Sequence, residues 1–512
     1  LISVLALVLL LGRALFLSDP PDWLDQKEFR FFTVFYFAFI QVLLVSATIF
    51  RLLKVLDLWW AKKMRPGLLL ILTFLFLIVV GTVLLKTPRA TTEPITWVES
   101  LFTSTSAVCV TGLIVVDTAE RFTFTGQAII LVLIQLGGLG LMTLTYFFAI
   151  LAGKGLSIRD RLFLRDLFSE ANLSSLGSAL CGAIILVASF ETVGAVLLYF
   201  QWSAIHPWPD QLLWDAVFHS VSSFCNAGFS TFTGNLAEPF LRSSYYSHWT
   251  VMVLVVIGGL GFPVLRELWL YGHALIRQLR KEPWEPKSRP KLGLHTRLVL
   301  TTTAVLLLGG MLFFLFAPSP FNGGITSLKG WHEALFNSVT ARTAGFNISE
   351  TAGYGTAATL LLILLMFIGG SPASTAGGIK TTTAALGFFN LIRILKGKKE
   401  VELFNRRIPE STTTAAFAIL LLSGLWIFAA SVVVSLFQPE LESLDVIFEC
   451  VSAFATVGLS RGVTSSLGAP SQIVLVFTMF VGRVGILLFI CTLFQSRKQS
   501  KLRHPEGSVI IN

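Results

Sequence analysis

A stretch of about a dozen residues occurs four times along this chain. Each copy opens on Phe, passes through small and hydroxyl side chains, and closes on Gly followed by a large apolar residue. Neighbouring closing glycines lie about 115 residues apart, and such a regular period indicates one structural unit used four times. The four copies are FTSTSAVCVTGL (102–113), FHSVSSFCNAGF (218–229), FNSVTARTAGF (336–346) and FECVSAFATVGL (448–459).

An acidic residue stands three positions before each opening Phe. Such a residue suits the first turn of a short helix, where it caps free N–H groups and offsets the positive end of the helix dipole. Each unit is therefore predicted to contain a short helix followed by an extended turn that ends in glycine. The four acids are Glu99, Asp215, Glu333 and Asp445.

The composition is that of a membrane protein. Hydrophobic residues make up 54% of the 512 residues and charged residues only 13%, whereas soluble proteins carry about 25% charge. Apolar runs of roughly 20 residues, the length that a bilayer requires, occur ten times. They lie at about 1–17, 31–50, 67–86, 124–151, 178–202, 249–271, 298–317, 356–395, 413–437 and 470–495.

The predicted fold is an all-α polytopic membrane protein. Each unit consists of a helix, a re-entrant short helix with its extended turn, and a second helix, and the four units surround one pore. Two further helices precede them. The predicted segments are 1–66 for the helix pair, then 67–170, 171–290, 291–407 and 408–512 for repeats one to four.

The net charge of +10 has a topological explanation and does not indicate nucleic-acid binding. Lys and Arg gather on every second side of the membrane, as the positive-inside rule requires. Both termini are therefore predicted to be cytoplasmic, and the four glycine turns to face outside. The basic segments are 51–65, 154–165, 266–297, 393–407 and 497–503.

Enzyme and metal chemistry find little support in the sequence. The five cysteines form no CxxC pair and the seven histidines form no ligand motif, so neither a disulfide framework nor a metal centre is indicated. A polytopic membrane enzyme would need a convergent set of His, acids or Cys at membrane depth, and the apolar runs contain no such set.

Four equivalent turns around one axis can line a pore with backbone carbonyls, which replace the hydration shell of a monovalent cation. Glycine reaches positive φ without a Cβ clash, so successive carbonyls can point the same way. The negative ends of the short helices also favour cations. Four simple tight turns are the alternative. The predicted ion-binding residues are Val110, Thr111, Gly112, Asn226, Ala227, Gly228, Thr343, Ala344, Gly345, Thr456, Val457 and Gly458.

The apolar run at 356–395 is too long for one crossing, and a stretch rich in Gly, Ser and Thr interrupts it. Irregular backbone persists at membrane depth only against protein or a water-filled cavity. Two half-helices joined by an intramembrane gate loop are therefore predicted, and only this unit shows a clear break. The loop comprises Gly369, Gly370, Ser371, Pro372, Ala373, Ser374, Thr375, Ala376, Gly377 and Gly378. In the other units, Gly137-Gly138 and Gly258-Gly259 predict close helix packing.

Isolated charges in the apolar runs have competing explanations. Arg483 lies near the depth of the loop, where a charge costs about 3 kcal/mol on insertion scales. It either holds the loop and repels cations, or packs against carbonyls. Lys380 either belongs to the gate or extends to the cytoplasmic surface. Glu191 is predicted to be a hydrogen-bonded carboxyl rather than a proton relay, and Arg342 to order the third turn through a carboxylate.

These motifs resemble the membrane subunit of the Trk/Ktr/HKT superfamily of potassium transporters. The filter motifs and the C-terminus look closest to the Ktr branch, whereas the extra helix pair is more like the Trk branch. The resemblance implies one pore per chain, a homodimer, a cytosolic nucleotide-binding ring of the RCK type as regulatory partner, and a basic residue beneath the filter at Arg483. It rests on TSAVCVTGL (105–113), SSFCNAGF (222–229), TARTAGFN (340–347), GGSPASTAGGIKT (369–381) and HPEGSVIIN (504–512).

The expected function is K⁺ uptake across the cell membrane, driven by a potential worth about 2.3 kcal/mol per charge per 100 mV. A Na⁺-conducting or Na⁺-coupled member is the first alternative. In the plant branch a Ser at the first filter Gly goes with sodium transport, so Gly112 favours potassium. A carrier with alternating access is a further alternative, which would show paired broken helices in its two halves.

Overall fold

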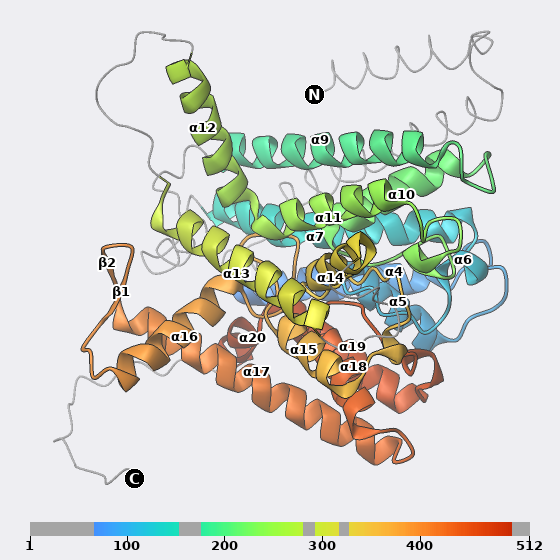
Figure 1. Ribbon diagram of the computed structural model, residues 1–512. Helices are drawn as coiled ribbons and strands as arrows, with labels where there is room; N and C mark the ends of the chain where they lie inside the picture. Colours follow the sequence, from blue (N-terminus) through green and yellow to red (C-terminus); the bar gives the residue numbers. More distant parts are fainter. Residues whose placement is uncertain (1–65, 153–175, 280–291, 317–326, 494–512) are drawn as a thin grey trace. The chain divides into compact units, whose positions relative to one another are not determined.

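The computed structural model describes residues 66–152, 176–279, 292–316 and 327–493 (Figure 1). The predicted spans at 1–17 and 31–50 and the motif at 504–512 lie outside the described residues. All described residues belong to one unit, Arg65–Asn512. They are mostly helical, with only two three-residue strands among them, which confirms the predicted all-α class.

Each repeat contains the predicted short helix between two longer segments (Figure 1). Repeat one has α4 (Pro66–Leu85), α5 (Trp97–Val108), α6 (Thr118–Arg121) and α7 (Phe124–Ala152). Repeat two has α9 (Leu176–Trp202), α10 (Leu212–Cys225), η2 (Asn235–Ala237), α11 (Tyr245–Leu260) and α12 (Phe262–Leu279). Repeat three has α13 (Leu294–Phe316), α14 (Leu328–Thr340), η3 (Thr351–Gly353), α15 (Thr356–Phe367) and α16 (Thr381–Leu395). Repeat four has α17 (Glu410–Phe437), α18 (Ser443–Ala455), η4 (Thr464–Ser466), α19 (Ala469–Val484) and α20 (Ile486–Leu493).

Among the described residues, three single helices are long and apolar enough to cross a membrane. They are Gly182–Trp202, Leu294–Phe316 and Glu410–Phe437. The pair α11 and α12 meets the same criteria together, although its two parts differ in direction by 102°. The first long helices of repeats two to four are thus continuous spans, whereas the second helices of these three repeats are shorter or broken.

The prediction that only the third unit is broken is wrong. Gly261 separates α11 from α12 with φ +84, and Gly485 separates α19 from α20 with φ +92. At Gly261 the loop of repeat three lies against the bend: a Cβ there would lie 2.7 Å from the carbonyl oxygen of Pro372. The N–H of Phe262, which begins α12, donates to the carbonyl oxygen of Ala373 at 3.2 Å. The loop therefore takes over a hydrogen bond that a continuous helix would make internally.

Glycines in the second long helices let these helices lie directly on the ends of the short ones. A Cβ added to Gly137 would overlap the carbonyl oxygen of Val108 at the end of α5. In the same way, a Cβ on Gly258 would overlap the carbonyl oxygen of Phe224, and one on Gly482 would overlap the carbonyl oxygen of Phe454. The predicted close packing through small residues is confirmed, and its partner in each case is the carboxyl end of a short helix.

A second repeated contact joins each short helix to the first long helix. Serine hydroxyls donate to carbonyl oxygens of the long helix one turn from a glycine that makes room for them. The bonds are Ser104 to Ile78 at 2.8 Å, Ser220 to Glu191 at 2.6 Å and Ser338 to Leu307 at 2.8 Å. These bonds fix the short helices at one depth in repeats one to three.

A small hairpin lies between α16 and α17, within the basic segment 393–407 and just beyond it. Strand β1 (Val401–Leu403) pairs antiparallel with β2 (Arg406–Ile408), with Val401 opposite Ile408. The two connecting residues, Phe404 and Asn405, both have positive φ, as a two-residue hairpin turn of the mirror-image type requires. These two strands are not predicted from the sequence.

Candidate functional site

The four glycine turns meet in a closed ring. A Cβ added to Gly112 would overlap the carbonyl oxygen of Ala227 in repeat two. Each following glycine faces the next turn in the same manner, and the last one returns to the first. The remaining contacts are Gly228 with Ala344, Gly345 with Val457, and Gly458 with Thr111. The structure thus brings together all four predicted triplets, in the order of the repeats, around one axis.

Each turn has the same backbone pattern: the first and third residues of the triplet have positive φ, and the middle residue does not. The glycines Gly112, Gly228, Gly345 and Gly458 have φ of +87, +69, +74 and +91. The first residues of the triplets are also left-handed: Val110, Asn226, Thr343 and Thr456 have φ of +57, +59, +70 and +50. Non-glycine residues adopt positive φ only where the surroundings hold them.

A hydroxyl side chain in each short helix holds the turn that follows. Ser106 donates to the carbonyl oxygen of Leu113 at 2.7 Å and accepts the N–H of Gly112 at 3.1 Å. Ser222 donates to Phe229 at 2.7 Å. The equivalents are Thr340, bonded to Phe346, and Ser452, which accepts the N–H of Gly458 at 3.1 Å. These four residues are not among those predicted from the sequence, although a Ser or Thr stands five or six positions before every closing glycine.

The acids in the short helices do not share one role. Glu99 forms the predicted capping box with Thr96, whose N–H lies 2.6 Å from the Glu99 carboxylate. Asp215 and Asp445 lie in the first turns of α10 and α18, as predicted, whereas Glu333 lies beyond the first turn of α14. The predicted capping bond is wrong for these three acids. Their carboxylates pair with side chains instead, with His206 at 2.9 Å, Lys329 at 3.8 Å and Arg461 at 2.5 Å respectively.

The loop Gly369–Gly378 joins α15 to α16, as predicted, and it lies against the inner ends of the turns. A Cβ on Gly377 would overlap the Thr456 hydroxyl, and one on Gly369 would lie 3.1 Å from the Thr343 methyl group. Toward repeat two, the Thr375 hydroxyl donates to the carbonyl oxygen of Phe224 at 3.1 Å. The N–H groups of Ser371 and Thr375 donate to the carbonyl oxygens of Gly259 and Gly258 at 2.9 and 3.3 Å. The loop is therefore fixed to three repeats by backbone bonds and close packing.

Three cations bond to carbonyl oxygens in or beside this loop. Arg483 donates to Thr375 at 2.5 Å and to Gly137 at 2.9 Å. Lys380 donates to the carbonyl oxygen of Ala376 at 2.7 Å, so its ammonium group is bonded to the loop. Arg342 donates to Gly369 at 3.1 Å. The prediction of a carboxylate partner for Arg342 is wrong, because exposed loop carbonyls supply the acceptor that the buried guanidinium needs.

Glu191 lies behind the second turn and is hydrogen-bonded, in agreement with the favoured interpretation. Its carboxyl accepts from the Gln135 amide at 3.1 Å and contacts the Cys225 thiol at 3.8 Å. Among the described residues, no group of three or more His, Cys, Asp or Glu could hold a metal ion.

Comparison with known proteins decides the family. A family model described as "TrkH: Cation transport protein" matches residues 62–503. The chain belongs to the TrkH family of cation transport proteins. This confirms the resemblance to the Trk/Ktr/HKT superfamily and the expectation of a membrane transporter rather than an enzyme.

Individual relatives extend over nearly the whole chain. The Ktr system potassium uptake protein B of Vibrio alginolyticus is 34% identical over 454 residues, which cover 88% of this chain and 95% of the relative. The potassium/sodium uptake protein NtpJ of Enterococcus hirae is 32% identical, with 88% and 98% covered. The crystal structure of the potassium transporter TrkH from Vibrio parahaemolyticus is similar in fold, with a TM-score of 0.65, 18% identity, and 84% and 86% covered.

Proposed function

We propose that this TrkH-family chain takes up K⁺ across the cell membrane through a filter formed by the four glycine turns. The observation that carries the proposal is the closed ring, in which each glycine with positive φ faces the next turn. The printed names of relatives at 32–34% identity, which describe potassium or potassium/sodium uptake, support K⁺ as the substrate.

The filter residues would act through their backbones. Carbonyl oxygens of the triplets at 110–112, 226–228, 343–345 and 456–458 replace the water around the ion. The short helices α5, α10, α14 and α18 end at these turns, so their negative ends favour a cation at the ring. The hydroxyls of Ser106 and its equivalents keep the turns in register while the ion passes.

The loop Gly369–Gly378 is the proposed gate. It lies against the inner ends of the turns, and Arg483 bonds to it from another repeat. In the closed state Arg483 and Lys380 would hold the loop carbonyls and present positive charge to a descending cation. Opening requires these bonds to break and the loop to move aside.

A homodimer with a cytosolic nucleotide-binding ring is the proposed assembly, by resemblance to the family. Segments 266–297 and 393–407 are candidate contacts because basic residues concentrate there on the predicted cytoplasmic side. The proposed location is the cell inner membrane, with both termini in the cytoplasm.

A Na⁺-conducting or Na⁺-coupled transporter is the second candidate, favoured by the relative named for potassium/sodium uptake. Purified chain in liposomes under an imposed potential separates the two. Faster K⁺ than Na⁺ influx with no sodium requirement supports K⁺ uptake. Equal influx of both ions, or K⁺ influx that depends on added sodium, supports the alternative.

A further inference from the structure

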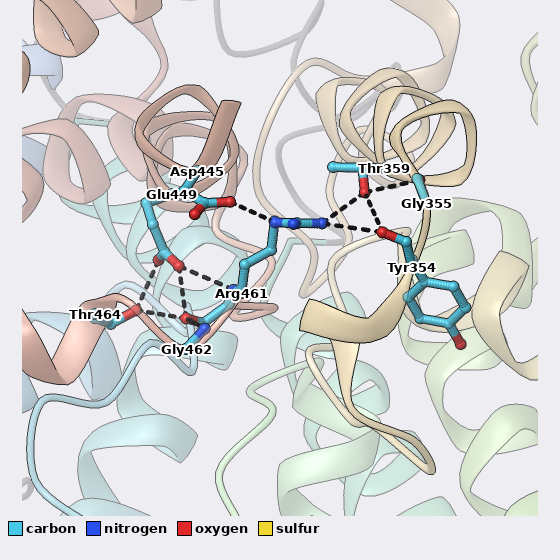
Figure 2. A network of polar contacts seen from close by, with 9 residues as sticks. Tyr354, Gly355, Thr359, Asp445, Glu449, Arg461, Gly462 and Thr464 are labelled. Carbon is cyan, nitrogen blue, oxygen red and sulfur yellow. Dashed lines mark hydrogen bonds and ion pairs between the residues drawn. The ribbon is translucent and has the colours of Figure 1, made fainter. Parts of the chain in front are cut away.

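The segment that leaves the fourth turn on the outer side is held by a buried carboxyl. Glu449 of α18 is only 2% exposed, and its carboxyl accepts from the Ser460 hydroxyl at 2.6 Å and from the N–H of Arg461 at 3.1 Å. The Thr464 hydroxyl donates to its second oxygen at 2.7 Å (Figure 2). Burial of an acid requires such donors, and here they all come from the residues directly after Gly458.

Arg461 extends from the same segment in two directions. Its Nε donates to Asp445 of α18 at 2.5 Å, and another guanidinium nitrogen donates to the Thr359 hydroxyl at 2.7 Å and to the Tyr354 carbonyl oxygen at 3.4 Å (Figure 2). Thr359 belongs to α15 of repeat three. A single side chain therefore ties the exit of the fourth turn both to its own short helix and to the neighbouring repeat.

The second turn has the same arrangement at equivalent positions. Glu449 stands nine positions before the closing glycine of repeat four, and His219 stands at the same position in repeat two. The His219 ring bonds to the Ser230 hydroxyl at 2.9 Å. The acid thirteen positions before the glycine, Asp215, accepts from Thr231 at 2.6 Å, just as Asp445 accepts from Arg461. His206 then pairs with the other oxygen of Asp215 at 2.9 Å.

Repeats one and three do not share this arrangement. In repeat one the equivalent of Glu449 is Thr103, whose buried hydroxyl has no partner among the described residues, and the serine is replaced by Ile114. In repeat three Asn337 bonds at 2.7 Å to the hydroxyl of Tyr354, nine residues after Gly345, rather than to the residues two and three positions after the glycine. Because the turns follow one another around the ring in the order of the repeats, the second and fourth turns, which have this arrangement, lie opposite each other.

We propose that these two sets of contacts, Glu449–Ser460 with Asp445–Arg461 and His219–Ser230 with Asp215–Thr231, are a pair of exit clamps that fix the outer end of the filter. Arg461 is then a positioning residue for cation selectivity. The inference rests on the proposed filter. Discrimination between K⁺ and Na⁺ needs carbonyls held at a set spacing and number, and two opposite fixed turns define that spacing across the ring.

The test compares K⁺ and Na⁺ influx in liposomes, per folded protein, for three variants. Ser460→Ala and Ser230→Ala remove one hydroxyl from each clamp with little effect on packing, and Arg461→Gln removes both ties of the guanidinium. Each is expected to lower the K⁺/Na⁺ influx ratio about threefold to tenfold, the range for one lost hydrogen bond. Arg121→Gln is the matched control, because Arg121 forms an exposed ion pair with Glu93 in repeat one.

Arg461→Lys separates positioning from charge. Lysine has one compact ammonium group and cannot reach Asp445 and Thr359 together in the geometry of the guanidinium. An influx ratio between those of the wild type and Arg461→Gln supports positioning, whereas full recovery shows that charge alone matters and overturns it. Gly458→Ser, measured in the same assay, distinguishes failure of the clamp proposal from failure of the filter proposal. A lowered ratio in Gly458→Ser with unchanged ratios in all clamp variants overturns the clamps alone, and unchanged ratios throughout overturn the filter as well.

Discussion

The guanidinium of Arg483 lies 2.5 Å from the carbonyl oxygen of Thr375, so a cation of repeat four holds the loop of repeat three. The same side chain donates to Gly137 of repeat one at 2.9 Å. The backbone bonds and close packing of the loop lead to repeats two, three and four. Among the described residues, Arg483 therefore connects the loop to repeat one, because its guanidinium bonds to both.

Replacing Arg483 with Ala is expected to raise K⁺ influx by about tenfold, because hydrogen bonds from a charged group contribute roughly 1.5–3 kcal/mol to the closed arrangement. Influx is measured per folded protein in liposomes, and Arg483→Lys is the control that keeps the charge. The K⁺/Na⁺ ratio should change little, since the turns are untouched. An unchanged or lower influx in Arg483→Ala would mean that the loop is a static kink.

Shortening the loop tests the gate without removing a charge. Deleting Ser374 and Thr375 removes the acceptor of Arg483 and the bond to Phe224 together. We expect faster K⁺ influx and weaker dependence on the regulatory ring, while selectivity stays near that of the wild type. A deletion variant that folds normally, as judged by size-exclusion chromatography, and conducts no faster than the wild type would contradict the gate.

Serine at Gly112 or at Gly228 is expected to lower the K⁺/Na⁺ influx ratio. Left-handed backbone costs a residue with a Cβ about 1–2 kcal/mol, and the added atom would press on the next turn. The matched control is Gly309→Ser in α13, where nothing lies within 4 Å of the added Cβ. If both filter variants express normally and keep the wild-type ratio, the filter assignment is wrong.

The bend at Gly261 gives a prediction about stability. Gly261→Ala should lower the melting temperature in detergent by several degrees, because φ is +84 and the Cβ would lie 2.7 Å from the Pro372 carbonyl oxygen. The expected cost is at least about 1–2 kcal/mol. Gly272→Ala in α12 is the control, since that Cβ meets nothing within 4 Å and alanine favours helix. Equal melting temperatures for the two variants would show that the loop does not impose the bend.

Docking of the cytosolic ring is expected to depend on charge. Reversal of the basic residues in 266–297 and 393–407 should weaken binding and remove most of its dependence on salt, because surface charges are screened beyond about 10 Å at 0.1 M salt. Binding is measured between the purified chain and the purified ring across a salt series. If the affinity and its dependence on salt concentration are both unchanged after the charge reversal, the ring does not bind these segments electrostatically.

Local signals made the ring predictable. Each turn needs glycine at a backbone angle that other residues avoid, and the requirement recurs in four copies, so Gly112 and Gly458 stand out in the sequence. The bend at Gly261 and the partner of Arg342 depend on a loop more than 25 residues away in the chain. Nothing in GGLG itself distinguishes a packing motif from a bend. The assignment of Arg342 to a carboxylate failed because loop carbonyls, which every residue carries, leave no mark in the sequence.

The contacts of Gly377 and Gly378 with Thr456 and Ala455 have a consequence for the ancestry of this fold. A pore assembled from four identical subunits would present the same inner segment four times, and four copies of such a loop would collide at the axis. A single copy avoids the collision, and a chain in which the repeats are covalently joined can give one repeat a segment that the others lack. Joining the four units in one polypeptide thus lets a ring of four similar turns carry one loop without fourfold symmetry, and the opening motion of the proposed gate would be one-sided.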